Sequence, residues 1–142
     1  MLLLQYSHKK TILFLYIIGI LTSCSNNNND NPESSKLIGK WKLVEQLADP
    51  GDGSGVFVSV VSNKTIEFFD DGTVVSNGTL CDMNLNTGEE TMGEYFATEN
   101  YIKPNNDCII PDFKISFELE NTNLLLWFPC IEGCGQKFVR MD

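Results

Sequence analysis

The feature that most constrains the fold is the run of residues 113–119, in which apolar and polar side chains alternate without a break. Successive side chains of a β-strand point to opposite faces, so this pattern predicts a strand with one buried face. The same criterion, together with the turn residues between segments, predicts further strands. They span residues 40–47, 56–61, 65–69, 73–76, 92–97, 124–128 and 136–141, and residues 101–103 would add one more.

The connections between these segments are mostly short. Asp70-Asp71-Gly72 separates two of the strands and indicates a hairpin, because glycine adopts the positive φ that such turns need. Short connections favour antiparallel pairing of sequence neighbours, and no segment has the period of a long amphipathic helix. The sequence therefore predicts an all-β fold, an antiparallel up-and-down meander that closes into a small barrel of about eight strands and so leaves no exposed edge.

The N-terminal segment has the layout of a secretory signal peptide. His8, Lys9 and Lys10 precede an apolar run over residues 11–21, and small residues lead to Cys24. A transmembrane helix needs about 20 apolar residues, and this run is about half as long. We therefore expect residues 1–23 to be a cleaved signal peptide.

The end of this segment, Leu21-Thr22-Ser23-Cys24, resembles the lipobox of bacterial lipoproteins. The resemblance implies diacylglyceryl transfer to the Cys24 thiol, cleavage before Cys24 and an amide-linked third acyl chain, with palmitate as an expected acyl group. Such chains would anchor the protein firmly in a membrane of the bacterial cell envelope. We expect the outer membrane, and the sequence leaves open whether the protein faces the periplasm or the cell surface.

Composition divides the rest of the chain into two parts. Residues 24–35 begin with Cys24 and are rich in Asn and Ser, which favour solvated coil, so we expect a flexible linker. Residues 36–142 have the commonest size of a single domain and contain no repeat, so we expect one β-barrel domain.

Several segments of this domain resemble a known family. Gly39 and Trp41 form the Gly-x-Trp pattern with which lipocalins open their first strand. Residues 65–73, 93–95 and 130–138, followed by Arg140, are similar to the small lipocalin-like lipoproteins of Bacteroidetes-type bacteria. Together these segments extend over most of residues 36–142. The resemblance implies a lipocalin-like barrel that binds a small apolar ligand and does not catalyse a reaction.

The resemblance also implies a motif at one end of the barrel. In lipocalins an arginine of the final strand packs over the tryptophan and closes that end through a cation–π contact. The matching positions here are Gly39, Trp41 and Arg140. Trp41 fits an ordinary core aromatic equally well. The chain is shorter than typical lipocalins and has no recognisable C-terminal helix, which argues against a large cavity.

Four cysteines follow Cys24, an even number that suits disulfides in an oxidising compartment. Four cysteines allow three pairings. Cys130 and Cys134 bracket a turn and predict one bridge, and Cys81 with Cys108 would then tie down the segment between the middle strands. A four-cysteine zinc site is the alternative, but these spacings do not match paired Cys-x-x-Cys ligands, so we expect no metal.

The sequence offers no catalytic constellation. The one histidine, His8, lies in the predicted signal peptide, which removes Ser-His and Cys-His activation and histidine metal ligands from the mature protein. Gly53-Ser54-Gly55 is not a nucleophile elbow, since Asp52 stands where that motif needs glycine. Calcium binding remains an alternative there, because Asp49, Asp52 and Ser54 offer oxygens, but the spacing is not that of an EF-hand loop. We expect no catalytic residue, no cofactor and no enzymatic activity.

The net charge and the predicted fold class limit the kinds of partner that we expect this protein to bind. The chain has 19 Asp and Glu against 10 Lys and Arg, and this acidity repels phosphate backbones, so we expect no nucleic acid. For a monomeric barrel anchored through Cys24, the first hypothesis is binding of a small apolar ligand inside the barrel. A protein- or glycan-interaction or inhibitor module, and a structural envelope lipoprotein with a filled core, stay open as alternatives. The candidate ligand-lining residues are Leu43, Phe68, Tyr95, Phe117 and Phe138.

Overall fold

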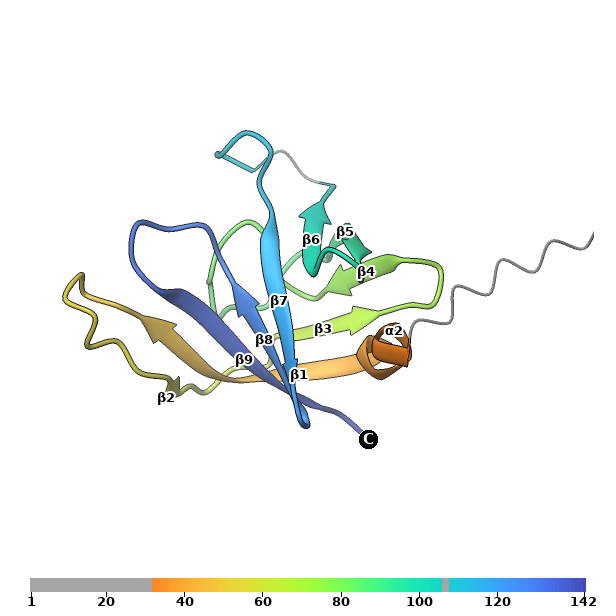
Figure 1. The fold of residues 1–142 in the computed structure, drawn as a ribbon, viewed down its shortest axis with the longest axis horizontal. Coiled ribbons are helices and arrows are strands. Elements are labelled where there is room, and N and C mark those ends of the chain that lie inside the picture. Colours follow the sequence, from red (N-terminus) through yellow and green to blue (C-terminus); the bar gives the residue numbers. More distant parts are fainter. Residues whose placement is uncertain (1–31, 106–107) are drawn as a thin grey trace, which may run out of the picture. The chain divides into compact units, whose positions relative to one another are not determined.

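The structure, a computed structural model, describes residues 32–105 and 108–142 (Figure 1). The predicted signal peptide, Cys24 and residues 25–31 of the predicted linker lie outside these residues. The described regular elements are one short helix, α2 (Pro32–Leu37), and nine strands. Across the two described stretches, no helix has the length and apolar character needed to cross a membrane.

The strands form one antiparallel sheet that closes on itself. Eight of them follow one another around a barrel, and the first pairs with the last to complete it, which confirms the predicted all-β up-and-down barrel. The ninth strand, β2, lies beside β1 at the outside of the ring. The strands are β1 (Gly39–Ala48), β2 (Val58–Ser59), β3 (Thr65–Phe68), β4 (Thr73–Ser76), β5 (Thr91–Phe96), β6 (Tyr101–Pro104), β7 (Ile115–Glu120), β8 (Asn123–Trp127) and β9 (Cys134–Arg140).

Strand β1 closes the barrel because its two edges pair with different strands, one with β3 and the other with β9. Its first residues pair with β3, and nearly its whole length pairs with β9, with Trp41 opposite Arg140. The register with β9 shifts between Leu43 and Glu45. Such a bulge bends a strand, and the second half of β1 runs on past β3 to pair with the short β2.

Two sequence predictions need correction here. Residues 56–61 do not form a barrel strand: only Val58–Ser59 pairs, at Glu45 and Gln46 of β1, and both residues are exposed. The reason is that β3 occupies the place beside the first half of β1, so this segment runs outside the ring. Residues 32–35, predicted as linker, belong to α2, which begins at a proline and ends at Leu37. Proline favours the first turn of a helix, and Leu37 is buried.

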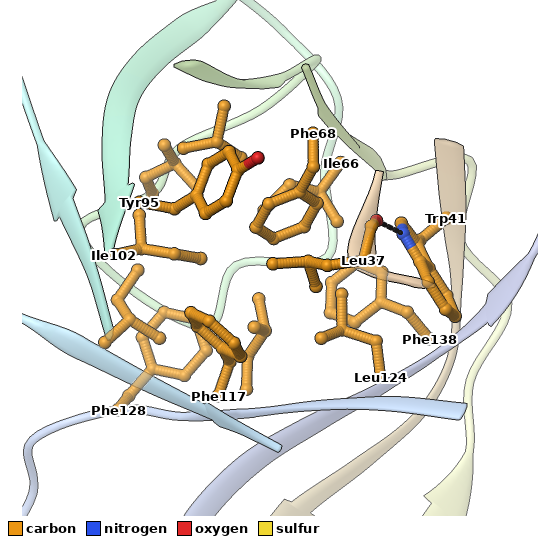
Figure 2. Close-up of a cluster of buried hydrophobic side chains, with 14 of the residues drawn as sticks. Leu37, Trp41, Ile66, Phe68, Tyr95, Ile102, Phe117, Leu124, Phe128 and Phe138 are labelled. Carbon is orange, nitrogen blue, oxygen red and sulfur yellow. Dashed lines mark hydrogen bonds between the residues drawn. The ribbon is translucent and has the colours of Figure 1, made fainter. Parts of the chain in front are cut away.

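The barrel has two different ends. At the short-turn end, which includes α2, the β3–β4, β5–β6 and β7–β8 turns each contain one residue with positive φ, namely Gly72, Asn100 and Asn121. At the loop end lie the longer connections β1–β2, β2–β3, β4–β5, β6–β7 and β8–β9. Between the two ends, alternate residues of the strands point inward, as the pattern of 113–119 predicts, and form one apolar core (Figure 2).

Candidate functional site

The residues predicted to line a ligand site all lie inside the barrel and form part of its core. The Phe68 ring makes edge-on contacts with the rings of Tyr95 and Phe117, whose centroids lie 5.2 and 6.2 Å away (Figure 2). These rings therefore pack against one another. The five residues, each from a different odd-numbered strand and none more than 8% exposed, are Leu43, Phe68, Tyr95, Phe117 and Phe138.

The short-turn end carries the contact that the lipocalin resemblance implies. The guanidinium carbon of Arg140 lies 4.7 Å from the centre of the Trp41 ring. Trp41 is buried, and its indole N–H donates a hydrogen bond of 2.9 Å to the Leu37 carbonyl at the end of α2 (Figure 2). Arg140 also donates to the carbonyls of Ile38 and Lys36. Arginine and tryptophan thus hold α2 against this end of the barrel.

Gly39 makes this arrangement possible. Its φ is +126°, a backbone conformation that side chains other than glycine rarely adopt. A Cβ atom at this position would also lie 2.6 Å from Nη1 of Arg140. The Gly-x-Trp pattern therefore has a physical basis here, because the glycine leaves room for the arginine that covers the tryptophan.

At the loop end, the β4–β5 connection covers the mouth of the barrel. This connection, residues 77–90, is called the 77–90 loop below. Leu80 is buried in the core, and Met83 and Leu85 pack against that core while partly exposed. The interior at this end is therefore filled in part by a loop and not by strands alone.

Three successive carbonyl groups of the 77–90 loop accept hydrogen bonds from the barrel rim. The carbonyls of residues 83–85 accept, in order, from Gln136 Nε2 at 3.0 Å, Lys64 Nζ at 3.1 Å and Ser62 Oγ at 2.6 Å. Gln136 belongs to β9, and the other two precede β3. Donors from distant parts of the sequence thus converge on one stretch of loop backbone.

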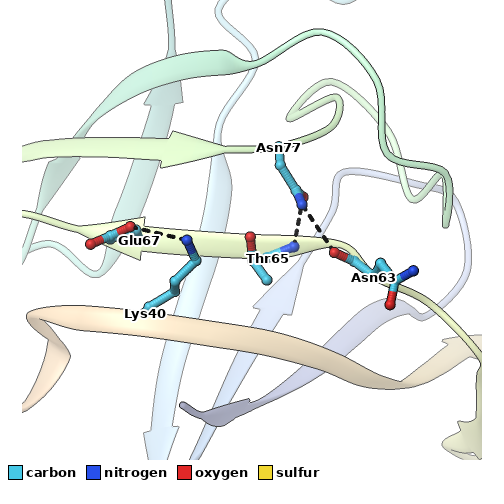
Figure 3. A network of polar contacts seen from close by, with 5 residues as sticks. All are labelled: Lys40, Asn63, Thr65, Glu67 and Asn77. Carbon is cyan, nitrogen blue, oxygen red and sulfur yellow. Dashed lines mark hydrogen bonds and ion pairs between the residues drawn. The ribbon is translucent and has the colours of Figure 1, made fainter. Parts of the chain in front are cut away.

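Asn77, the first residue of the 77–90 loop, is held in place by the hydrogen bonds of its own side chain. Its side-chain oxygen accepts the Thr65 N–H at 2.7 Å, and its amide group donates to the Asn63 carbonyl at 3.0 Å (Figure 3). At the other side of the loop base, the Thr91 hydroxyl donates to the Gly78 carbonyl at 2.6 Å. Both loop ends are therefore anchored to neighbouring strands.

Lys64 is the most unusual titratable group in the described part of the chain. It is only 2% exposed, and burial lowers the pKa of its ammonium from 10.5 to about 8, although the Asp82 carboxylate acts in the opposite direction. Beside the same loop backbone, Gln136 is fully buried and donates to Gln46, while its Oε1 has no hydrogen-bond partner among the described atoms. A small polar region thus lies under the loop, at the top of an apolar interior.

Sequence reasoning missed both of these polar residues, although a signal was present. Lys64 stands two positions before Ile66, and Gln136 stands two positions before Phe138. Because residues two apart share a strand face, continuing each strand pattern toward the loop end places both side chains inward. Because polar side chains usually lie on the surface, the inward direction of Lys64 and Gln136 was not predicted.

The structure contains both predicted disulfides. Cys81 of the 77–90 loop is bonded to Cys108 of the β6–β7 connection, with Cα atoms 5.3 Å apart. Cys130 is bonded to Cys134 across the β8–β9 turn, with Cα atoms 6.2 Å apart. The four cysteines are therefore engaged in covalent pairs, and the zinc alternative has no free thiolates on which to form.

The acidic 49–55 segment does not have the geometry of a calcium site. The Asp49 carboxylate accepts hydrogen bonds from four backbone N–H groups within this segment, at 2.7–3.2 Å. The first of these bonds, from Gly51, is the main reason why the pKa of Asp49 is lowered. Its oxygens are thus directed at its own loop. Within residues 32–105 and 108–142, no three His, Cys, Asp or Glu side chains are placed to hold a metal together.

No protein-family model and no curated protein matches this sequence. The described site comprises a packed apolar interior, one end closed by Trp41 and Arg140, and another end covered by a loop that buried polar side chains hold in place.

Proposed function

We propose that this chain is a lipid-anchored, non-catalytic protein of the bacterial envelope, in which a filled lipocalin-like barrel is a rigid module for protein or glycan contacts. The observation that carries the proposal is the packing of the Phe68 ring against the rings of both Tyr95 and Phe117, which occupies interior space that a ligand carrier would leave open. In a filled barrel, specificity has to come from the exterior, and loops on a rigid scaffold are where binding residues concentrate.

The loop end is the proposed contact surface. Val61, Ile109 and Ile131 are fully exposed there, on three different connections. Exposed apolar side chains at loop tips suit contact with a partner, because their burial on binding would stabilise a complex. The N-terminal segment with its proposed lipid anchor joins the domain at α2, which belongs to the opposite end. We therefore propose the loop end, and not the end at which the chain enters the domain, as the contact surface.

The anchor itself is supported by the N-terminal residues alone. The basic, apolar and small-residue tracts occur in the order of a lipoprotein signal and end at Cys24. We propose the outer membrane as the location. Metabolic labelling with a radioactive fatty acid tests this: label should enter the wild-type protein and be absent from Cys24→Ala, which should no longer sediment with membranes. Unchanged membrane attachment of Cys24→Ala would contradict the lipid anchor.

A second candidate function, binding of a small apolar ligand inside the barrel, is favoured by one observation. Leu80, Met83 and Leu85 fill the mouth from a loop, so displacement of that loop would vacate apolar space without breaking the strand ladder. Native mass spectrometry of the protein extracted from membranes separates the two functions. A co-purified lipid at one per barrel supports the ligand carrier, and protein free of any such ligand supports the filled module.

Site-specific photocrosslinking tests the contact surface directly. A photoreactive amino acid at Ile109 or Ile131 should yield a crosslinked partner in intact cells. The matched control is the same substitution at Met141, an exposed apolar residue of the short-turn end, which should yield none. Crosslinks from Met141 alone would contradict the assignment of the loop end.

A further inference from the structure

The 77–90 loop is attached to the barrel in two ways. The residues at its two ends, the base, continue the sheet, whereas its middle part, the tip, is held on the barrel only by side-chain contacts and one disulfide. We infer that this loop is a lid that moves away from the barrel mouth as one unit and thereby controls access to the interior. The inference rests on the second candidate function, entry of a small apolar ligand, and names how that entry is regulated.

The base of the lid stays in place because it continues the sheet. Asn77 is bonded through its side chain to both sides of the β3 start, and the Gly88 N–H donates to the Asn77 carbonyl at 3.0 Å. Thr91 is paired with Ser76 where β5 begins. A movement of the loop therefore pivots on the positions next to Asn77 and Gly88.

The tip keeps its own shape through bonds inside the loop. The Asp82 carboxylate accepts the Asn84 N–H at 2.8 Å, and the Asn84 side chain accepts the Asn86 N–H at 2.9 Å. The Thr79 hydroxyl accepts the Cys81 N–H at 3.0 Å. None of these bonds involves the barrel, so all of them persist when the tip leaves it.

The bonds between tip and barrel are of a different kind. The carbonyls of residues 83–85 are held by side chains of Gln136, Lys64 and Ser62, which water can replace one by one. The barrel strands, in contrast, share a continuous backbone ladder. Segments with few backbone bonds to the rest of a protein open at lower free energy than the core. The lid thus opens at a lower free energy than the strands of the barrel.

Hydration of the Lys64 ammonium favours the open state of the lid. In the closed lid, its ammonium lies under loop backbone and away from water, and Asp82 of the lid is the charged group that acts on it. Gln136 and Ser62, which hold the neighbouring carbonyls, are neutral. An open lid hydrates the ammonium and so removes the desolvation that the closed state imposes.

The disulfide between Cys81 and Cys108 opposes this opening. It ties the lid to the β6–β7 connection, while the other disulfide, Cys130–Cys134, crosses a turn elsewhere at the loop end. The chain therefore offers a matched pair of variants. The Cys81→Ser/Cys108→Ser protein lacks the lid staple, and the Cys130→Ser/Cys134→Ser protein lacks an unrelated bridge.

Acylation of the Lys64 amine by an amine-reactive ester, in the full mature chain, measures opening, because the closed lid buries this amine and an open lid exposes it. In the protein without the lid staple, we expect at least a tenfold increase in the rate of Lys64 acylation relative to that of exposed Lys40, the internal reference. Hydrogen exchange at the β8 amides, recorded in parallel, measures global unfolding and should rise much less. The Cys130→Ser/Cys134→Ser control should not change the ratio of the two acylation rates.

Ser62→Ala is the second variant, in case removal of the staple prevents folding. It deletes one bond to the lid and should give a several-fold change in the same direction. Lys64 acylation that is no faster than the global unfolding measured at the β8 amides, in every variant, would show that Lys64 is exposed only by global unfolding and would overturn the lid.

An apolar fluorescent dye, anilinonaphthalene sulfonate, tests the underlying function separately. Saturable binding by the folded protein without the staple, and none by the wild type, supports regulated ligand entry. Faster Lys64 acylation without any dye binding contradicts the second candidate function and leaves the lid itself established.

Discussion

Arg140 occupies the space that a side chain at position 39 would need, since a Cβ atom on Gly39 would lie 2.6 Å from Nη1 of Arg140. The two residues come from opposite ends of the domain sequence and meet because β1 and β9 pair to close the barrel. Closure of the sheet, the cover over Trp41 and the position of α2 therefore depend on one another.

Gly39→Ala should destabilise the protein by about 1–3 kcal/mol, because alanine is strained at a φ of +126° and its Cβ displaces Arg140. Urea unfolding measures the change. Gly88→Ala is the matched control, since no atom lies within 4 Å of its added Cβ, and it should shift stability by less than about 0.5 kcal/mol. Equal effects of the two substitutions would contradict the proposed role of Gly39.

Trp41→Ala should lower the free energy of unfolding by about 3–5 kcal/mol, because it removes a large buried ring from the core. Arg140→Lys should have a smaller effect, since an ammonium keeps the charge but loses the planar contact with the ring. Denaturant unfolding of both variants tests this order. A midpoint for Trp41→Ala close to that of the wild type would show that the ring is not part of the closed end.

The two disulfides should differ in their effect on stability. Cys81 and Cys108 close a loop with a sequence separation of 27, and Cys130 and Cys134 one with a separation of 4. Loop-closure entropy then gives about 3.5 and about 2 kcal/mol, respectively. Thermal unfolding of the two double-serine proteins measures the difference, and peptide mapping without reduction checks the pairing. A Cys81–Cys130 peptide would contradict the connectivity.

Stability should rise with pH above about 8 through Lys64. Its pKa is about 8 in the folded protein and 10.5 without burial, so the unfolded chain binds more protons between these values. The free energy of unfolding therefore increases across this window, by about 3 kcal/mol for a shift of this size. The Lys64→Met protein lacks this contribution and supplies the reference. Parallel stability curves for the two proteins from pH 7 to 10.5 would show that Lys64 is solvated.

The fold was largely predictable from the sequence because a barrel strand imposes a period of two on its residues. The run 113–119 and its counterparts carry that pattern, and the hairpin at Gly72 follows from local turn chemistry. Residues 56–61 were the exception. They are apolar enough for a strand, but whether they enter the ring depends on which segment lies beside β1, and this is a nonlocal competition that β3 wins.

The candidate site was predictable only in part. The identity of the inward residues follows from alternation, and Trp41 with Arg140 follows from a resemblance. Whether Phe68 faces a ligand or another ring depends on how much space remains inside, and no single strand encodes that volume.

The sequence by itself thus determined the alternation that makes strands, the turns that join them, and an even number of cysteines after a signal-like segment. The tertiary structure alone decided that the interior is packed and that Lys64 and Gln136 meet the backbone of the 77–90 loop. The physical reason is distance along the chain. Local pattern sets which face a side chain takes, whereas contacts between β3, β9 and a loop exist only once the sheet has closed on itself.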